Sequence, residues 1–138
     1  MTEDVLGIRI GRAQEYRERA SHYRRNFEEE RGRRSKEKAG EALWGVVSCL
    51  LNAIAILEKG KPCFEHRLLS NFAKQFLVSS FEDGEQLARI YKKVEKFHAN
   101  FYHAFLDDEE FEQIGADIWR LVERLDRTLV DKLHKLQL

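Results

Sequence analysis

The stretch LWGVVSCLLNAIAIL, residues 43–57, decides the fold of this 138-residue chain. Leucine, valine and isoleucine define one face of the helix that this stretch predicts, and other apolar residues fill most of the remaining circumference. A helix that is apolar nearly all round is usually a buried one. Gly60 and Pro62 follow closely and stop the helix. We therefore expect a helix over residues 36–59 at the centre of the fold.

Four other segments carry apolar residues at helical spacing, and no segment has the strict alternation of a strand. The expected helices cover residues 8–31, 65–79 and 85–104, and a last one runs from an N-cap at 107–108 to about residue 136. The connections between them are short, which favours antiparallel neighbours. The sequence thus predicts an all-α, antiparallel up-and-down helical bundle of about five helices, in a single domain over residues 1–138.

Composition and charge limit the kind of protein this is. Hydrophobic residues make up 43% of the chain and charged residues 35%, as in a soluble globular protein. Lys and Arg number 24, as do Asp and Glu, so bulk charge gives no reason to expect nucleic acid or an anionic membrane. The N-terminus has no signal-peptide core, and residues 43–57 are too few to span a bilayer. We expect a cytoplasmic protein with no membrane contact.

The segment HANFYH, residues 98–103, contains the densest group of chemistry-bearing side chains. On a helix His98 and His103 point about 140° apart, so within one helix they cannot share a metal ion. His98 instead aligns with Tyr91, Glu95 and Tyr102, at spacings of seven, three and four residues. We expect these four side chains to form a polar and aromatic stripe at the rim of the bundle.

Two interpretations of this stripe stay open. In a pocket, the imidazole of His98 could transfer protons near neutral pH with Glu95 tuning it, which makes His98, Tyr102 and Glu95 the catalytic candidates. Alternatively, His98 is a boundary residue bonded to a neighbouring helix, and the tyrosines pack their rings. The sequence offers no second partner for the proton, which favours the structural interpretation. Tyr91, His98 and Tyr102 are also candidates for binding a ligand.

The central helix carries a polar seam as well. Glu37, Glu41, Ser48 and Asn52 fall close together on the helical wheel, and Gly45 leaves space among them. Polar groups in so apolar a helix need partners, which could be the rim of the fourth helix, a dimer contact or water. Glu41 and Asn52 are therefore further ligand-binding candidates.

Signatures of cofactor and metal chemistry are absent from the sequence. It has no P-loop, GxGxxG, GxSxG or HExxH motif, and no Glu-x-x-His that would complete a di-iron site with the paired glutamates. Cys49 and Cys63 lack the spacing of a zinc site or a disulfide framework, and Cys49 is expected to act as a small buried hydrophobe. We expect no cofactor and no metal.

The runs SKEKAGEALWG (residues 35–45) and FHANFY (residues 97–102) resemble the signatures of the archaeal PaREP-type proteins, which belong to the HEPN-like superfamily. The resemblance covers roughly residues 13–129. It implies a HEPN-like helical bundle that forms a homodimer. It also implies one of two functions, because some superfamily members are nucleotide-associated partners of nucleotidyltransferases and others are metal-independent ribonucleases with an Arg-x4–6-His motif.

The sequence departs from the ribonuclease motif. The nearest arginine before His98 is Arg89, which is too far away, and the region before His103 offers no arginine at the required spacing. Arg127 and His134 fit the spacing but lie near the end of the last helix. We therefore expect a non-catalytic accessory module that binds a nucleotide, RNA or a protein partner as a homodimer. The alternatives are a ribonuclease that uses His98 and a purely structural interaction module.

Overall fold

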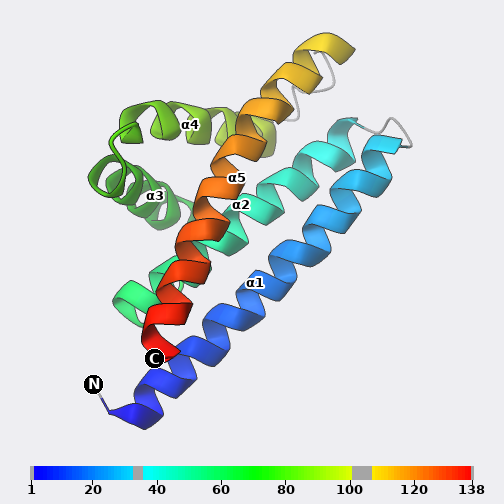
Figure 1. The fold of residues 1–138 in the computed structure, drawn as a ribbon. Helices are drawn as coiled ribbons and strands as arrows, with labels where there is room; N and C mark the ends of the chain where they lie inside the picture. Colours follow the sequence, from blue (N-terminus) through cyan, green and yellow to red (C-terminus); the bar gives the residue numbers. More distant parts are fainter. Residues whose placement is uncertain (1, 33–35, 101–106, 138) are drawn as a thin grey trace.

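The computed structural model describes residues 2–32, 36–100 and 107–137, with side chains for 2–30, 38–95 and 107–137. This part of the chain is all-helical and has no strands, which confirms the predicted class and the number of helices. The helices are α1 (Glu3–Gly32), α2 (Lys36–Lys59), α3 (His66–Ser80), α4 (Gly84–Asn100) and α5 (Asp108–Gln137), as labelled in Figure 1. The largest difference from the predicted boundaries is at the start of α1, five residues earlier than expected.

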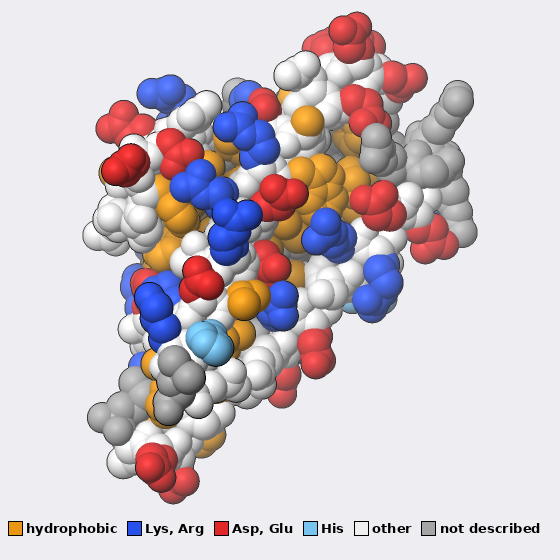
Figure 2. Space-filling view, in the orientation of Figure 1, with side chains coloured by type: hydrophobic (Ala, Val, Ile, Leu, Met, Phe, Trp, Pro, Cys, Tyr) orange, Lys and Arg blue, Asp and Glu red, His pale blue; other side chains and the backbone are white. Residues whose placement is uncertain are grey.

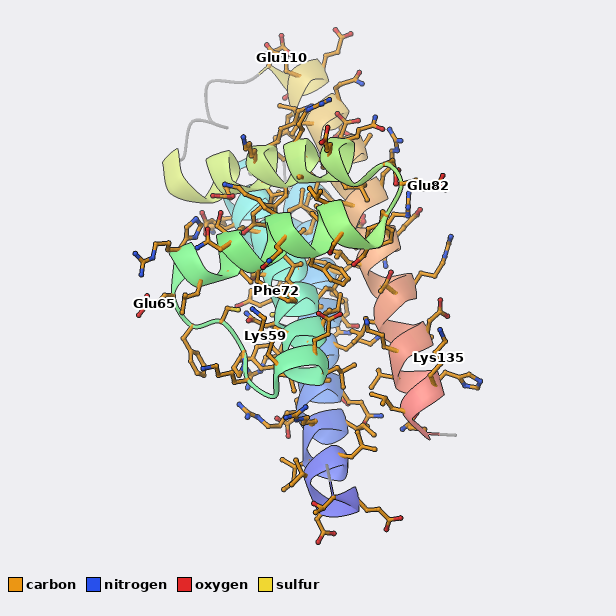
Figure 3. All side chains as sticks on the ribbon, turned by 90° about the vertical axis from the view of Figure 1, so that its left-hand side faces the viewer. Lys59, Glu65, Phe72, Glu82, Glu110 and Lys135 are labelled. Carbon is orange, nitrogen blue, oxygen red and sulfur yellow. The ribbon has the colours of Figure 1, made fainter. Side chains whose placement is uncertain are left out.

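The helices do not all follow one axis. α1, α2 and α5 run alongside one another, with α2 and α5 both antiparallel to α1 (Figure 1). The α3–α4 hairpin lies crosswise over α2 and α5, as the turned view in Figure 3 also shows. The up-and-down arrangement predicted from the sequence therefore describes α1, α2 and α5 but not the hairpin. Because α2 is apolar over most of its circumference, it needs cover from more directions than a single antiparallel neighbour provides.

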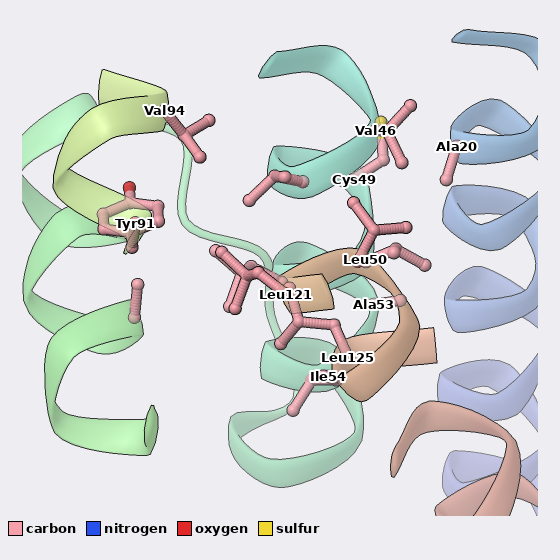
Figure 4. Packing of buried hydrophobic residues seen from close by; sticks show 14 of the residues in the cluster. Ala20, Val46, Cys49, Leu50, Ala53, Ile54, Tyr91, Val94, Leu121 and Leu125 are labelled. Atoms are coloured by element: carbon pink, nitrogen blue, oxygen red, sulfur yellow. The ribbon is translucent and has the colours of Figure 1, made fainter. Parts of the chain in front are cut away.

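The core is centred on α2, as predicted. Leu43, Leu51 and Ile54 of this helix have no exposed surface. Side chains from α1, α4 and α5 converge on it, including those of Ala20, Val94 and Leu121 (Figure 4). The segment Lys38–Lys59 is long and apolar enough to cross a membrane by those criteria alone, but 78% of its most apolar stretch is buried inside the fold. Its burial by the other helices accounts for its composition.

The turn between α3 and α4 is fixed by a close approach and an ion pair. A Cβ atom on Gly84 would overlap the carbonyl oxygen of Leu77, so only glycine lets α4 start this close to α3. Arg124 of α5 donates two hydrogen bonds to the Asp83 carboxylate, at 2.9 and 3.0 Å, and its guanidinium lies 4.7 Å from the centre of the Phe81 ring. These contacts join the crosswise hairpin to α5.

Candidate functional site

Glu95 of α4 lies at the centre of a polar cluster that joins α3 to α4. Its Oε1 accepts a hydrogen bond of 3.0 Å from the hydroxyl of Ser70, and its Oε2 lies 3.2 Å from Nε2 of His66. His66 begins α3 and Ser70 follows one turn later, so both side chains lie on the helix face that meets α4. The side chain of His66 is 44% exposed and that of Glu95 is 22% exposed. We call His66, Ser70 and Glu95 the Glu95 clamp.

The geometry of the Glu95 clamp does not match a nucleophile–base arrangement. A serine nucleophile needs its hydroxyl hydrogen-bonded to the imidazole that takes its proton. Here the Ser70 hydroxyl donates to the carboxylate, and the same carboxylate holds His66. Glu95 was expected to tune His98, and the structure shows that it is bonded to two residues of α3. The side chains of His98 and Tyr102 lie outside the described residues.

Tyr91 lies in the core and not at the rim that the sequence analysis predicted. Its side chain is 0% exposed, and its hydroxyl has no hydrogen-bond partner among the described residues. Burial raises the pKa of Tyr91 well above its ordinary value, and the negative charge of Glu95 acts in the same direction. The correction has a simple cause: α2 and its Trp44, whose ring centre lies 6.3 Å from that of Tyr91, cover a position that α4 considered alone leaves at the edge.

The polar residues of α2 do not form one cluster. The Asn52 side-chain oxygen accepts a hydrogen bond of 2.6 Å from the backbone N–H of Cys63, so Asn52 holds the α2–α3 connection against α2. Glu41 and Ser48 instead line a groove between α1 and α2. The side chain of Glu37 lies outside the described residues. The helical wheel thus places Asn52 next to Glu41 and Ser48, but Asn52 contacts the α2–α3 connection and does not line the groove.

The α1–α2 groove has a volume of about 750 Å³. Its lining comes from both helices: Tyr23, Asn26 and Glu30 of α1, and Lys38, Glu41, Ala42, Trp44, Gly45, Ser48 and Cys49 of α2. Gly45 was predicted to leave space on α2, and the ring of Tyr23 occupies that space. A Cβ atom on Gly45 would lie 2.5 Å from the Tyr23 ring, so the residue must be glycine for the ring to lie there.

Trp44 connects the groove to the Glu95 clamp. It forms part of the groove lining, and its ring centre lies 5.3 Å from that of His66. The groove and the clamp are therefore neighbouring parts of one region, at which α1, α2 and the hairpin meet. The face of the molecule that carries α5 interleaves basic and acidic side chains over the described surface (Figure 2), which gives that face no broad patch of one sign.

The two cysteines are not activated nucleophiles. Burial raises the pKa of the Cys49 thiol to about 11, and burial also raises the pKa of Cys63. Both thiols are therefore protonated at neutral pH, whereas the thiolate is the reactive form. Among the residues that the structure describes, no three histidine, cysteine or acidic side chains are grouped so as to hold a metal ion.

Sequence reasoning missed His66 and Ser70 as partners of Glu95, and it treated Tyr23 and Trp44 only as apolar positions. The spacing of four between His66 and Ser70 was a usable signal, because it puts both on one face of a short helix that precedes a tight turn. No protein-family profile, curated protein or solved structure matches this chain.

Proposed function

We propose that this chain is a non-catalytic accessory module of the HEPN-like superfamily, which acts as a homodimer and binds a chemical group of its partner in the α1–α2 groove. The observation that carries the proposal is the groove itself. Its volume of about 750 Å³ falls within the range of roughly 300–1,000 Å³ that is usual for ligand sites. The aromatic side chains of Tyr23 and Trp44 supply contact area, and Asn26 and Ser48 supply polar groups that orient a ligand.

The chemistry of the surrounding side chains supports binding over catalysis. The Ser70 hydroxyl and His66 are both engaged by one carboxylate, so neither is arranged to activate the other. Cys49, which lines the groove, holds its proton at neutral pH because burial raises its pKa to about 11. The homodimer and the superfamily membership rest on the sequence resemblance.

Thermal shift measurements test whether the groove binds ligands, since a ligand that binds the folded state raises its melting temperature. The probes are nucleosides, nucleotides, short RNA, polyamines and short basic peptides. In the variant Ser48→Phe an added ring fills the groove, and Ser79→Phe places the same ring on an exposed position of α3. We expect at least one probe to stabilise the wild type and Ser79→Phe but not Ser48→Phe. An equal shift in all three proteins would contradict the groove as the site.

Two further measurements address catalysis and assembly. We expect no cleavage of mixed RNA by the wild type at high protein concentration. Cleavage that disappears in His98→Ala would favour the ribonuclease alternative instead. Sedimentation at micromolar concentration is expected to show a dimer, and a monomer would contradict that part of the proposal.

A further inference from the structure

Phe64 is the most exposed large apolar side chain in the part of the chain that the structure describes, at 82%. It belongs to the connection between α2 and α3, and Leu68, one helical turn further along, is 46% exposed. Figure 3 shows this connection on the outside of the molecule, between the labelled residues Lys59 and Glu65. We call residues 59–68 the Phe64 corner.

The backbone that leads to Phe64 is held in place. The N–H of Cys63 donates a hydrogen bond of 2.6 Å to the side-chain oxygen of Asn52, and Pro62 is buried. The connection is thus anchored to α2 immediately before Phe64. The exposure of the Phe64 ring therefore follows from the fold, which buries its neighbour in the chain and displays the ring to solvent.

Basic side chains flank Phe64 in the sequence and in space. Lys61 and Arg67 are exposed on either side of it. Lys59 is exposed as well, and its ammonium lies 5.0 Å from the centre of the Phe72 ring of α3. From α1, the guanidinium of Arg9 reaches the start of the same connection. Four cations from three helices and their connection therefore lie at or beside the corner.

Acidic side chains near the corner are few. Residues 59–81 include four Lys or Arg residues and a single acidic one, Glu65. Just before this range, Glu58 pairs with Lys132 of α5 at 3.0 Å. On α4, the Glu95 carboxylate is bonded to two residues of α3. The corner therefore has a net positive charge, although the chain as a whole is balanced.

An apolar ring that projects among cations fits an anionic lipid surface. A peripheral protein binds a membrane through buried apolar area and through attraction between basic side chains and anionic headgroups. The interface of a bilayer closes around a projecting side chain without a preformed pocket, whereas a protein partner must offer a surface of matching shape. An RNA base could stack on Phe64, but it would gain little from the aliphatic side chain of Leu68.

We propose that the Phe64 corner docks this protein reversibly on a membrane surface that contains anionic phospholipids. Phe64 and Leu68 enter the interfacial region, and the cations of the corner contact lipid phosphates. The proposal is independent of the α1–α2 groove, whose lining shares no residue with the corner. The balanced charge of the whole chain gave no reason to expect membrane contact, because it averages a local basic surface with the rest of the molecule.

Co-sedimentation of the full-length protein with lipid vesicles tests the proposal. The vesicles consist of phosphatidylcholine alone or of phosphatidylcholine mixed with phosphatidylserine. Phe64→Ala removes the projecting ring, and Arg67→Gln removes one positive charge. Val130→Ala and Arg127→Gln make the corresponding changes at exposed positions of α5. Because all four side chains are exposed, each variant should unfold in urea like the wild type.

We expect the wild type to bind the mixed vesicles but not phosphatidylcholine alone, and to bind more weakly at high salt. Affinity should fall about tenfold in Phe64→Ala, the low end of what burial of a phenylalanine side chain contributes. It should fall about fivefold in Arg67→Gln, as expected for one cation near an anionic surface. Both α5 controls should keep the affinity of the wild type.

The inference is wrong if the wild type does not sediment with the mixed vesicles, if it binds both kinds of vesicle equally, or if Phe64→Ala keeps full affinity. A short single-stranded RNA and a glutamate-rich peptide serve as alternative probes. If the wild type binds one of them, Phe64→Ala does not, and no protein sediments with vesicles, the corner recognises that macromolecule and the lipid inference fails. None of these results bears on ligand binding in the α1–α2 groove.

Discussion

Replacing Tyr91 with phenylalanine would remove one buried oxygen atom and leave the aromatic ring in place. The hydroxyl has no hydrogen-bond partner among the described residues, and the side chain is 0% exposed. Burying an unpaired polar group costs about 1–3 kcal/mol relative to its hydration in the unfolded chain. We therefore expect Tyr91→Phe to raise the free energy of unfolding by about 1 kcal/mol, the low end of that range, because the surrounding side chains can relax.

The expected change in melting temperature follows from the size of the chain. An unfolding entropy of about 2.1 cal/mol/K per residue gives roughly 0.3 kcal/mol/K for 138 residues, so 1 kcal/mol corresponds to about 3 °C. Urea unfolding followed by circular dichroism measures the free energy, with Tyr16→Phe as the control at a partly exposed tyrosine. We expect no significant change in the control. A loss of stability in Tyr91→Phe would refute the reasoning, because it would mean that the hydroxyl has a stabilising partner.

The same substitution has a pH signature. Burial, and secondarily the charge of Glu95, raise the pKa of Tyr91 in the folded state above its ordinary value of about 10. The unfolded chain therefore releases this proton at lower pH than the folded protein does. The contribution of Tyr91 to stability is complete below about pH 10 and is lost as the pH rises further. The advantage of Tyr91→Phe over the wild type should accordingly grow above about pH 10, and an advantage independent of pH would contradict this account.

Three further experiments test the packing and the ion pair that joins the hairpin to α5. Gly84→Ala would push a methyl group into the backbone at the end of α3, and we expect it to lower the free energy of unfolding in urea by about 2–3 kcal/mol. The control Gly11→Ala, with open space around it on α1, should raise the free energy of unfolding by about 0.5–1 kcal/mol. Similar effects at both sites would contradict the close approach at Gly84. The hydrogen bonds from Arg124 lower the pKa of Asp83. The difference in free energy of unfolding between the wild type and Arg124→Ala should therefore be constant above about pH 4 and shrink as the pH falls below it. An equal difference at pH 3 and pH 7 would argue against the ion pair. A thiol reagent at pH 8 should label Cys49 only after unfolding, because burial raises its pKa to about 11. Fast labelling of Cys49 itself in the native protein, measured separately from that of the partly exposed Cys63, would contradict its burial.

The helices were predictable because apolar periodicity records which face of each segment is buried. α2 is the clearest case, since residues around most of its circumference are buried, as its composition indicated. The early start of α1 was not predictable in this way. Val5 and Ile8 are 42% and 63% exposed, so the first turns of α1 extend past the core and their helical state leaves no trace in the apolar pattern.

The crosswise position of the α3–α4 hairpin depends on contacts that periodicity does not encode. Gly84 permits one close approach of backbone to backbone, and Arg124 reaches a carboxylate 41 residues earlier in the chain. Short connections favour antiparallel neighbours, and α3 and α4 are indeed neighbours. The hairpin contacts both α2 and α5, so its direction relative to α2 depends on residues that are distant in the sequence.

In the candidate site too, the sequence predicted positions on single helices but not the contacts between helices. Wheel geometry found the polar residues of α2 and the position of Glu95, but the partner of Glu95 had to come from another helix. His66 and Ser70 lie 29 and 25 residues away in sequence, and only the hairpin brings them to the carboxylate. Tyr91 illustrates the reverse error, because a residue at the edge of one helix's apolar face becomes fully buried when a second helix covers it.

The contacts of Trp44 give Glu95 a part in the site that differs from proton transfer. Glu95 holds His66 at 3.2 Å, the His66 ring centre lies 5.3 Å from that of Trp44, and Trp44 forms a wall of the α1–α2 groove. Glu95 thus supports Trp44 through the ring of His66. The hairpin that carries Glu95 is itself joined to α5 by the ion pair of Arg124 with Asp83. In the proposed function, Glu95 therefore has the part of a positioning residue for the groove. Of the stripe predicted on α4, Glu95 thus contacts the residue that packs against Trp44, and in the proposed function recognition falls to the residues that line the groove itself.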